Sequence, residues 1–143
     1  MLRPKRDDRG QTLLLAPIAL LIVVILGSVT LEVGALHLRQ RQLDDLADSI
    51  ANDAATVGFD VEEFRSTGTV TINAAAASSV ISPSIVISNL PEARATAVDI
   101  GPGPEPSATI TLSFTHEFIL GRMLFGASTE LSATGEAALV PSN

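Results

Sequence analysis

The stretch Leu13–Leu31, LLLAPIALLIVVILGSVTL, determines how the rest of this chain is organised. Its nineteen residues carry no charge, and Arg9 precedes them while Glu32 follows them. At a rise of about 1.5 Å per residue they form a helix about 28 Å long. The hydrocarbon core of a bilayer is about 30 Å thick. We therefore expect a transmembrane helix, with membrane lipid as its surroundings.

The charges on the two sides of this helix predict its orientation. The first ten residues hold four bases and two acids, whereas the residues from Asp44 onward hold thirteen acids and three bases. Basic flanks favour the cytoplasmic side, so we expect a cytoplasmic leader and an outer C-terminal domain. A secretory signal peptide has a similar start, but its apolar run is shorter and ends at a small-residue cleavage site. Cleavage after this helix is therefore the less favoured interpretation.

Composition excludes several functional classes. The 143 residues include no Cys, Trp or Tyr, and the formal net charge is −7. Without Cys there is neither a disulfide framework nor a thiolate metal site. An acidic chain lacks the basic patch that nucleic-acid binding requires. The sequence therefore predicts no nucleic-acid partner and no cofactor.

The helical pattern continues beyond the membrane segment and ends at Gly58. Apolar residues recur every seven positions at Leu36, Leu43, Ile50 and Val57, and Ala47 and Ala54 fill the positions between them. This amphipathic stripe packs either on the chain's own C-terminal domain or laterally on neighbouring helices. Within the membrane half, Gly27 and Gly34 share one face, where small residues permit close helix packing. Glycine is also simply common in membrane helices, so both interpretations of this pair stay open.

The expected organisation is a basic leader at 1–10, a transmembrane helix at 11–34, an amphipathic extension at 35–58 and a small domain at 59–143. Strict alternation predicts two antiparallel strands at Ser107–Phe118 and Ser128–Val140. Shorter strands are expected at Thr69–Ile72, Ser84–Ser88 and Ala93–Ile100, and a short helical turn or loop at Val61–Arg65. Asn73 is the expected N-cap of a short helix that ends before Pro83. The predicted fold is therefore α+β, with one long helix packed on a small antiparallel sheet.

A search for catalytic or metal-binding patterns finds almost nothing. His37 and His116 are far apart in sequence, and we expect His116 to be a hydrogen-bonded core residue because it falls on the apolar strand face. The acidic run Asp44, Asp45 and Asp48 lacks the spacing of a calcium loop. No phosphate loop, nucleophile elbow or zinc-protease motif occurs, so the prediction is that the protein is not an enzyme. Glu32 either marks the boundary with water or pairs with a base such as Arg39 of a neighbouring chain.

An ordered set of short motifs resembles a known family. Asp8-Arg9-Gly10-Gln11 precedes the proline-containing membrane helix, Leu31-Glu32-Val33-Gly34-Ala35-Leu36 ends it, and Arg39-Gln40-Arg41-Gln42-Leu43 and Asp45-Leu46-Ala47-Asp48 follow. This order is similar to that of the TadE/TadG-like group of Tad/Flp pilus-assembly proteins, over about residues 6–58. The resemblance implies a pilin-like protein in the bacterial cytoplasmic membrane, and other pilus or secretion-assembly membrane proteins as its partners.

TadE-like members resemble prepilins, and the resemblance implies a prepilin peptidase that would cut between Gly10 and Gln11. Prepilins usually carry Glu at the fifth mature position, which is Leu15 in this chain, so whether the leader is cut stays open. The alternative function is a single-pass membrane protein whose acidic outer domain binds a soluble partner unrelated to pili.

Overall fold

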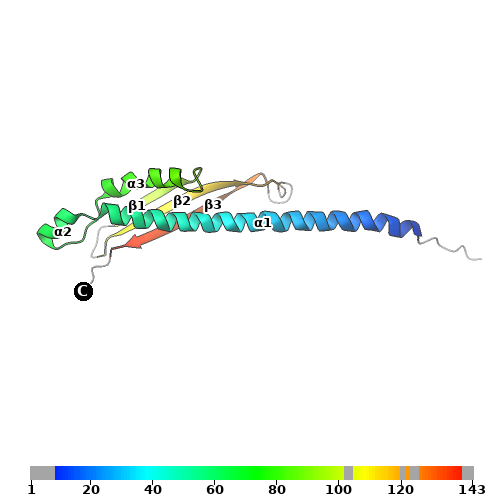
Figure 1. The fold of residues 1–143 in the computed structure, drawn as a ribbon, viewed down its shortest axis with the longest axis horizontal. Helices are drawn as coiled ribbons and strands as arrows, with labels where there is room; N and C mark the ends of the chain where they lie inside the picture. Colours follow the sequence, from blue (N-terminus) through cyan, green and yellow to red (C-terminus); the bar gives the residue numbers. More distant parts are fainter. Residues whose placement is uncertain (1–8, 102–104, 120–121, 123–125, 140–143) are drawn as a thin grey trace, which may run out of the picture.

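The computed structural model describes residues 9–101, 105–119, 122 and 126–139, with side chains from residue 15 onward. The elements are α1 (Arg9–Gly58), α2 (Val61–Thr67), α3 (Ala74–Ile87), β1 (Arg94–Gly101), β2 (Ser107–Glu117) and β3 (Ser128–Ala138). Figure 1 shows that the second half of α1 runs along the sheet while its first half extends beyond the domain. The predicted α+β architecture, one long helix packed on a small antiparallel sheet, is confirmed.

The three strands form one antiparallel sheet in the order β1-β2-β3. β2 and β3 pair along their full length, for example Phe114 with Leu131, as their alternating patterns predicted. β1 pairs with the other edge of β2 and has an irregularity between Ala95 and Ala97. α1 and α3 pack on the apolar face of the sheet, and none of the described helices covers the face rich in Ser and Thr.

The core lies between the second half of α1, α3 and the apolar face of β2 and β3. Its main cluster comprises Leu43, Ala47, Ile50, Ala51, Ile81, Ile85, Leu90, Ala93, Ile110, Leu112, Phe114, Leu131 and Ala133. Burying one such aliphatic side chain stabilises a fold by about 1.5–3 kcal/mol. Because α1 supplies the core residues on one side, its second half is an integral part of the C-terminal domain.

α3 corrects two predictions. Asn73 is its N-cap as expected, and the side-chain oxygen accepts hydrogen bonds from the amides of Ala75 and Ala76 at 3.0 and 3.1 Å. The helix does not end before Pro83, however, and the strand predicted at Ser84–Ser88 is wrong. Ile81 and Ile85 lie one helical turn apart and are both buried in the core. Their packing outweighs the one backbone hydrogen bond that a proline removes from a helix.

The connection between α1 and α3 also differs from the prediction. The strand predicted at Thr69–Ile72 is reduced to a single bridge between Phe59 and Ile72. α1 ends at Gly58 as expected, and the amide of Asn73 donates to the Gly58 carbonyl oxygen at 2.6 Å. A Cβ at Gly58 would lie 2.6 Å from Cγ2 of Ile72 and 3.0 Å from Cβ of Ala77. Glycine is therefore needed here for close packing.

α1 is longer than the sequence predicted. It begins at Arg9, two residues before the expected start at residue 11, and Pro17 lies inside it. The short helix α2 agrees with the turn predicted at Val61–Arg65, with Asp60 as its N-cap.

Candidate functional site: the exposed half of the long helix and its junction with the sheet

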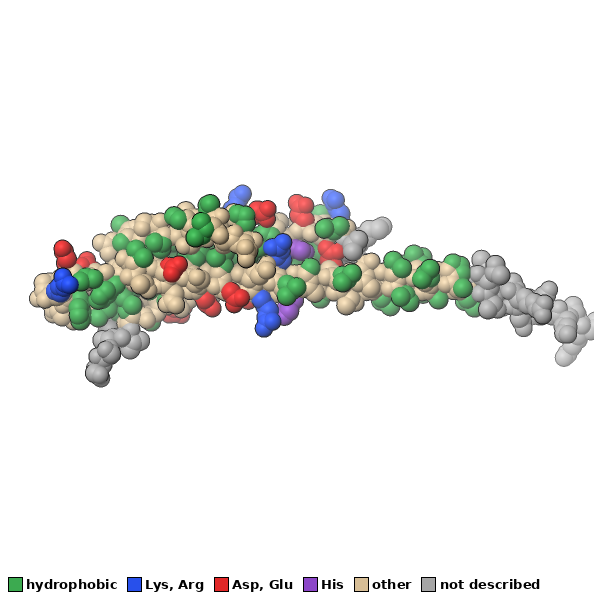
Figure 2. All heavy atoms as spheres, viewed as in Figure 1, with side chains coloured by type: hydrophobic (Ala, Val, Ile, Leu, Met, Phe, Trp, Pro, Cys, Tyr) green, Lys and Arg blue, Asp and Glu red, His purple; other side chains and the backbone are tan. Residues whose placement is uncertain are grey.

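The N-terminal half of α1 is apolar and exposed along its described length. Large side chains such as Leu20, Leu26 and Leu31 are all more than half exposed, whereas the core helix of a soluble domain would bury them. Figure 2 shows this half as a rod of hydrophobic side chains projecting from a domain with acidic and basic groups on its surface. α1 is long and apolar enough to cross a membrane, and the chain fits a single-pass membrane protein.

The hydroxyls of Ser28 and Thr30, in this half of α1, are hydrogen-bonded inside the helix. The hydroxyl of Ser28 donates to the carbonyl of Val24 at 2.8 Å, and that of Thr30 donates to the carbonyl of Leu26 at 2.9 Å. In hydrocarbon, where water is absent, an unpaired polar group is costly. These bonds make the two hydroxyls compatible with a lipid environment.

Gly27 and Gly34 lie in open space, with no atom within 4 Å of the position that a Cβ would occupy. They are seven residues apart and therefore share one face of α1. By the same periodicity this face is opposite to the side that carries Glu32 and Leu43, which faces the domain. The predicted pair is thus available for a partner, since no described atom of this chain covers either position.

The outer part of the predicted stripe is occupied by the chain's own domain. Leu43, Ala47, Ile50 and Ala54 are fully buried, and Leu36 packs against the edge of the core. Val57 departs from the stripe because its side chain is 51% exposed. Of the two alternatives for the stripe, packing on the C-terminal domain is the one found in this chain.

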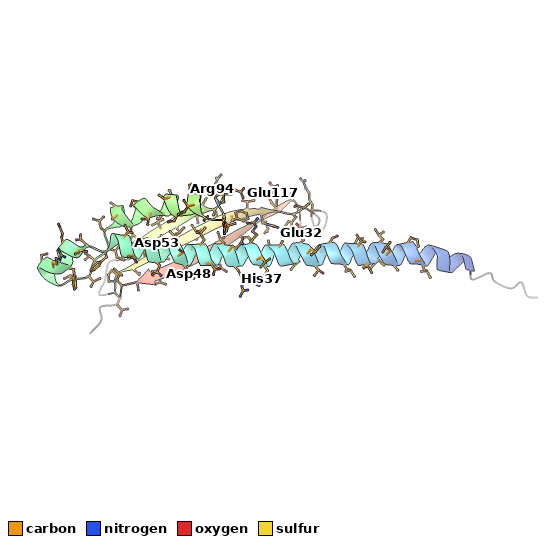
Figure 3. The ribbon with its side chains drawn as sticks, in the orientation of Figure 1. Glu32, His37, Asp48, Asp53, Arg94 and Glu117 are labelled. Carbon is orange, nitrogen blue, oxygen red and sulfur yellow. The ribbon has the colours of Figure 1, made fainter. Side chains whose placement is uncertain are left out.

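Glu32 forms the junction between α1 and the far end of the sheet. One carboxylate oxygen accepts a hydrogen bond from the backbone amide of Ile119 at 2.8 Å, and the residue is only 7% exposed. Figure 3 shows Glu32 near the end of the sheet and His37 on the side of α1 away from the strands. The two bonded residues are 87 positions apart, and a backbone amide leaves no mark in the sequence, so sequence reasoning missed this contact.

Arg39, the base considered as a neighbour's partner for Glu32, is engaged within this chain. Its guanidinium carbon lies 5.9 Å from the centre of the Phe114 ring, which is a cation–π geometry. Its Nη1 also lies 3.4 Å from the side-chain oxygen of Gln42. Arg39 thus packs over the β2 edge of the core.

α1 comes closest to the sheet at Gly135 of β3. A Cβ on Gly135 would overlap the backbone of Ala47 and Asp48. About two turns before Ala47 on α1, the side-chain amide of Gln40 donates to the Ser132 carbonyl at 3.0 Å and to Asp44 at 2.9 Å. A glycine inside an alternating strand indicates close backbone approach, so the sequence did hold a signal for this contact.

The described residues offer little catalytic chemistry. They contain no group of three His, Asp or Glu side chains that could hold a metal ion. His116 is not the hydrogen-bonded core residue expected, because its buried Nε2 has no partner among the described residues and its ring meets Phe118 edge-on at 5.4 Å. A groove of about 670 Å³ on the polar side of the sheet is lined by Glu92, Arg94, Ser113, Phe114, Thr115, Glu117 and Glu130. Its charged groups are acidic except for Arg94.

The predicted processing site lies at the start of α1. Gly10 and Gln11 are in its first turn, and their side chains lie outside the described residues. The leader at residues 1–8 lies outside them as well. No family model matches this chain, and neither a curated protein nor a solved structure shows significant similarity to it.

Proposed function

We propose that this protein is a minor-pilin-like, single-pass component of a Tad/Flp-type pilus or related secretion assembly. Its N-terminus would lie in the cytoplasm and its C-terminal domain outside the bacterial cytoplasmic membrane. In the sequence, the ordered motifs over residues 6–58 support the proposal. The structure supports it through the continuous α1, whose apolar half projects from the domain with its large described side chains exposed.

The free face at Gly27 and Gly34 supports lateral assembly within the membrane. Small residues allow two helix backbones to approach closely in lipid, where dispersion contacts drive association. Because the domain already covers Leu43, Ala47 and Ile50, a partner helix would pack on the opposite face of α1. Assembly would then leave the core of the domain intact.

Cysteine cross-linking in the native host tests this proposal, because the chain has no cysteine of its own. Gly27→Cys places a thiol on the free face, and Ile25→Cys places one at nearly the same depth on the domain side. We expect Gly27→Cys to be captured by another copy or by a pilus or secretion-assembly membrane protein, with several-fold less capture at Ile25→Cys. Equal capture at the two positions would overturn the proposal. So would the failure of Gly27→Cys to capture another copy or any pilus or secretion-assembly membrane protein.

The N-terminus can be tested separately by mass spectrometry of the protein from native membranes. A mature chain that starts at Gln11 would indicate processing by a prepilin peptidase. An intact leader would make the protein a resident membrane anchor of the assembly rather than a subunit of a fibre.

The acidic groove supports the second candidate function, a membrane-anchored domain that binds a soluble basic partner. Glu92, Glu117 and Glu130 line it with Arg94 as the one described base. A pull-down with residues 36–143 discriminates between the two, since this fragment keeps the core but lacks the membrane half. Specific capture that is lost in a Glu117→Lys variant would favour the soluble partner over lateral assembly.

A further inference from the structure

The end of the sheet that joins β2 to β3 lies level with the end of the apolar helix. Glu32 is the first charged residue after the nineteen uncharged ones, and its carboxylate holds the Ile119 amide at 2.8 Å. Glu32 is nearly buried, so the backbone at Ile119 is held directly against α1. The outer domain therefore begins at the point where the apolar helix surface ends.

Ile119 presents an apolar side chain at this junction. Its side chain is 84% exposed although its backbone is held by Glu32. Leu31, which precedes Glu32 on α1, is 71% exposed as well. Arg122, also exposed, is the one charged residue in the sequence from Phe118 to Gly126. An exposed isoleucine with a nearby arginine suits the lipid interface, where apolar stems enter the lipid and cationic heads stay in water.

We propose that Ile119 and Arg122 form a second membrane contact of this chain, resting in the outer headgroup layer of the bilayer. The inference rests on the membrane span of the proposed function. The hydrocarbon core is about 30 Å thick and the headgroup layers bring the bilayer to about 40–45 Å. With the span ending at Leu31, Ile119 lies within the outer headgroup layer. Its side chain contacts the upper acyl chains, and the Arg122 guanidinium pairs with lipid phosphate.

The chain offers a matched control at Ile87, the last residue of α3. It is the same residue type and is also 84% exposed. It lies next to Ser88, which lines a groove with Leu46 of α1. Leu46 is about 21 Å further along α1 than Glu32. Ile87 should therefore stand in water, well clear of the headgroups.

Single cysteines at three positions of the full-length protein test the contact. Ile119→Cys, Ile87→Cys and Leu26→Cys are each labelled with an environment-sensitive fluorophore and reconstituted in vesicles of phosphatidylcholine and phosphatidylglycerol. Quenching by lipids that carry a spin label at a shallow or a deep position of the acyl chain reports depth. We expect the 119 probe to be quenched at least twofold more than the 87 probe, most strongly by the shallow label. The 26 probe should be quenched best by the deep label.

Each outcome separates the contact from the span. If the 26 probe is quenched and the 119 probe behaves like the 87 probe, the second contact is overturned while the span stands. If the 26 probe is not quenched either, the span fails and both proposals fall. An Arg122→Gln substitution in the labelled Ile119→Cys protein, reconstituted in the same vesicles, tests the charge. The variant should show at least twofold less shallow quenching at position 119, and unchanged quenching would remove Arg122 from the contact.

Discussion

Gly135 is the residue at which α1 approaches the sheet most closely. Gly135→Ala would place a methyl group against the backbone of Ala47 and Asp48, and α1 can yield only by moving off β3. Alanine is otherwise the better strand residue, so a loss of stability would come from this contact alone. We expect the free energy of unfolding to fall by about 1–3 kcal/mol, as in overpacked cores. Denaturant unfolding in mild detergent, followed by circular dichroism, measures it.

Gly34→Ala is the matched control, because a Cβ there meets nothing and alanine favours a helix by about 1 kcal/mol over glycine. This variant should be as stable as the parent or slightly more stable. Equal effects of the two substitutions would contradict the close approach at Gly135.

Glu32 allows a second prediction for a single residue. Glu32→Ala removes the carboxylate oxygen that accepts the Ile119 amide. A hydrogen bond to a charged group contributes about 1.5–3 kcal/mol, so hydrogen exchange at that amide should accelerate by at least tenfold. Exchange measured by mass spectrometry on the peptide that contains Ile119 tests this. Glu32→Gln keeps an acceptor oxygen and should show a smaller effect, and identical exchange in both variants and the parent would contradict the bond.

These residues show where sequence reasoning succeeds and where it fails. The apolar positions Leu43, Ala47 and Ile50 were recognised by periodicity because burial repeats along a helix. The partner of Glu32 could not be recognised, because it is a backbone amide brought near by the hairpin of β2 and β3. His116 was placed correctly on the apolar strand face, but its missing hydrogen bond depends on the neighbours that surround it in three dimensions.

Among the elements, α3 is the one whose type the sequence obscured. The run from Ser84 to Ser88 alternates like a strand, and Pro83 suggests the end of a helix. Ile81 and Ile85 nevertheless bury on one helical face against α1. In contrast, β2 and β3 were predicted correctly because their alternation extends over many residues and admits one register with a buried apolar face.

Pro83→Ala distinguishes the helix from a strand at this point. Within a helix the substitution restores an amide donor and removes a clash, so we expect the free energy of unfolding to rise by about 2 kcal/mol. The melting temperature of the detergent-solubilised protein measures the gain. Pro91→Ala, in the turn before β1, serves as the control and should give no such gain. An unchanged or lower melting temperature in Pro83→Ala would argue against α3 as a continuous helix.

On the scale of the whole molecule, the C-terminal domain and α1 share a single core. A fragment of residues 36–143 keeps the α1 side chains of that core, whereas residues 59–143 would expose the apolar face of the sheet. We expect the longer fragment to be soluble and to unfold cooperatively. The shorter one should aggregate or bind hydrophobic dyes, as measured by size-exclusion chromatography and dye fluorescence. Cooperative folding of residues 59–143 alone would contradict the shared core.

The orientation across the membrane is a prediction at the same scale. In intact cells a membrane-impermeant maleimide should label Ile87→Cys, whereas Lys5→Cys in the leader should react only after permeabilisation. Both variants should remain in the membrane pellet after a carbonate wash. Labelling of Lys5→Cys but not Ile87→Cys in intact cells would reverse the orientation, and release by carbonate would refute the span.

The uninterrupted run of α1 from Glu32 to Gly58 has a mechanical consequence. These residues extend about 39 Å, and the packed sheet stiffens most of that length. Membrane helices tilt by about 20° on average, and a tilt of that size would swing the tip at α2 sideways by about 13 Å. The position of α2 would therefore change with the tilt of the helix in lipid. Conversely, a sideways force on α2 would exert a torque on the membrane segment.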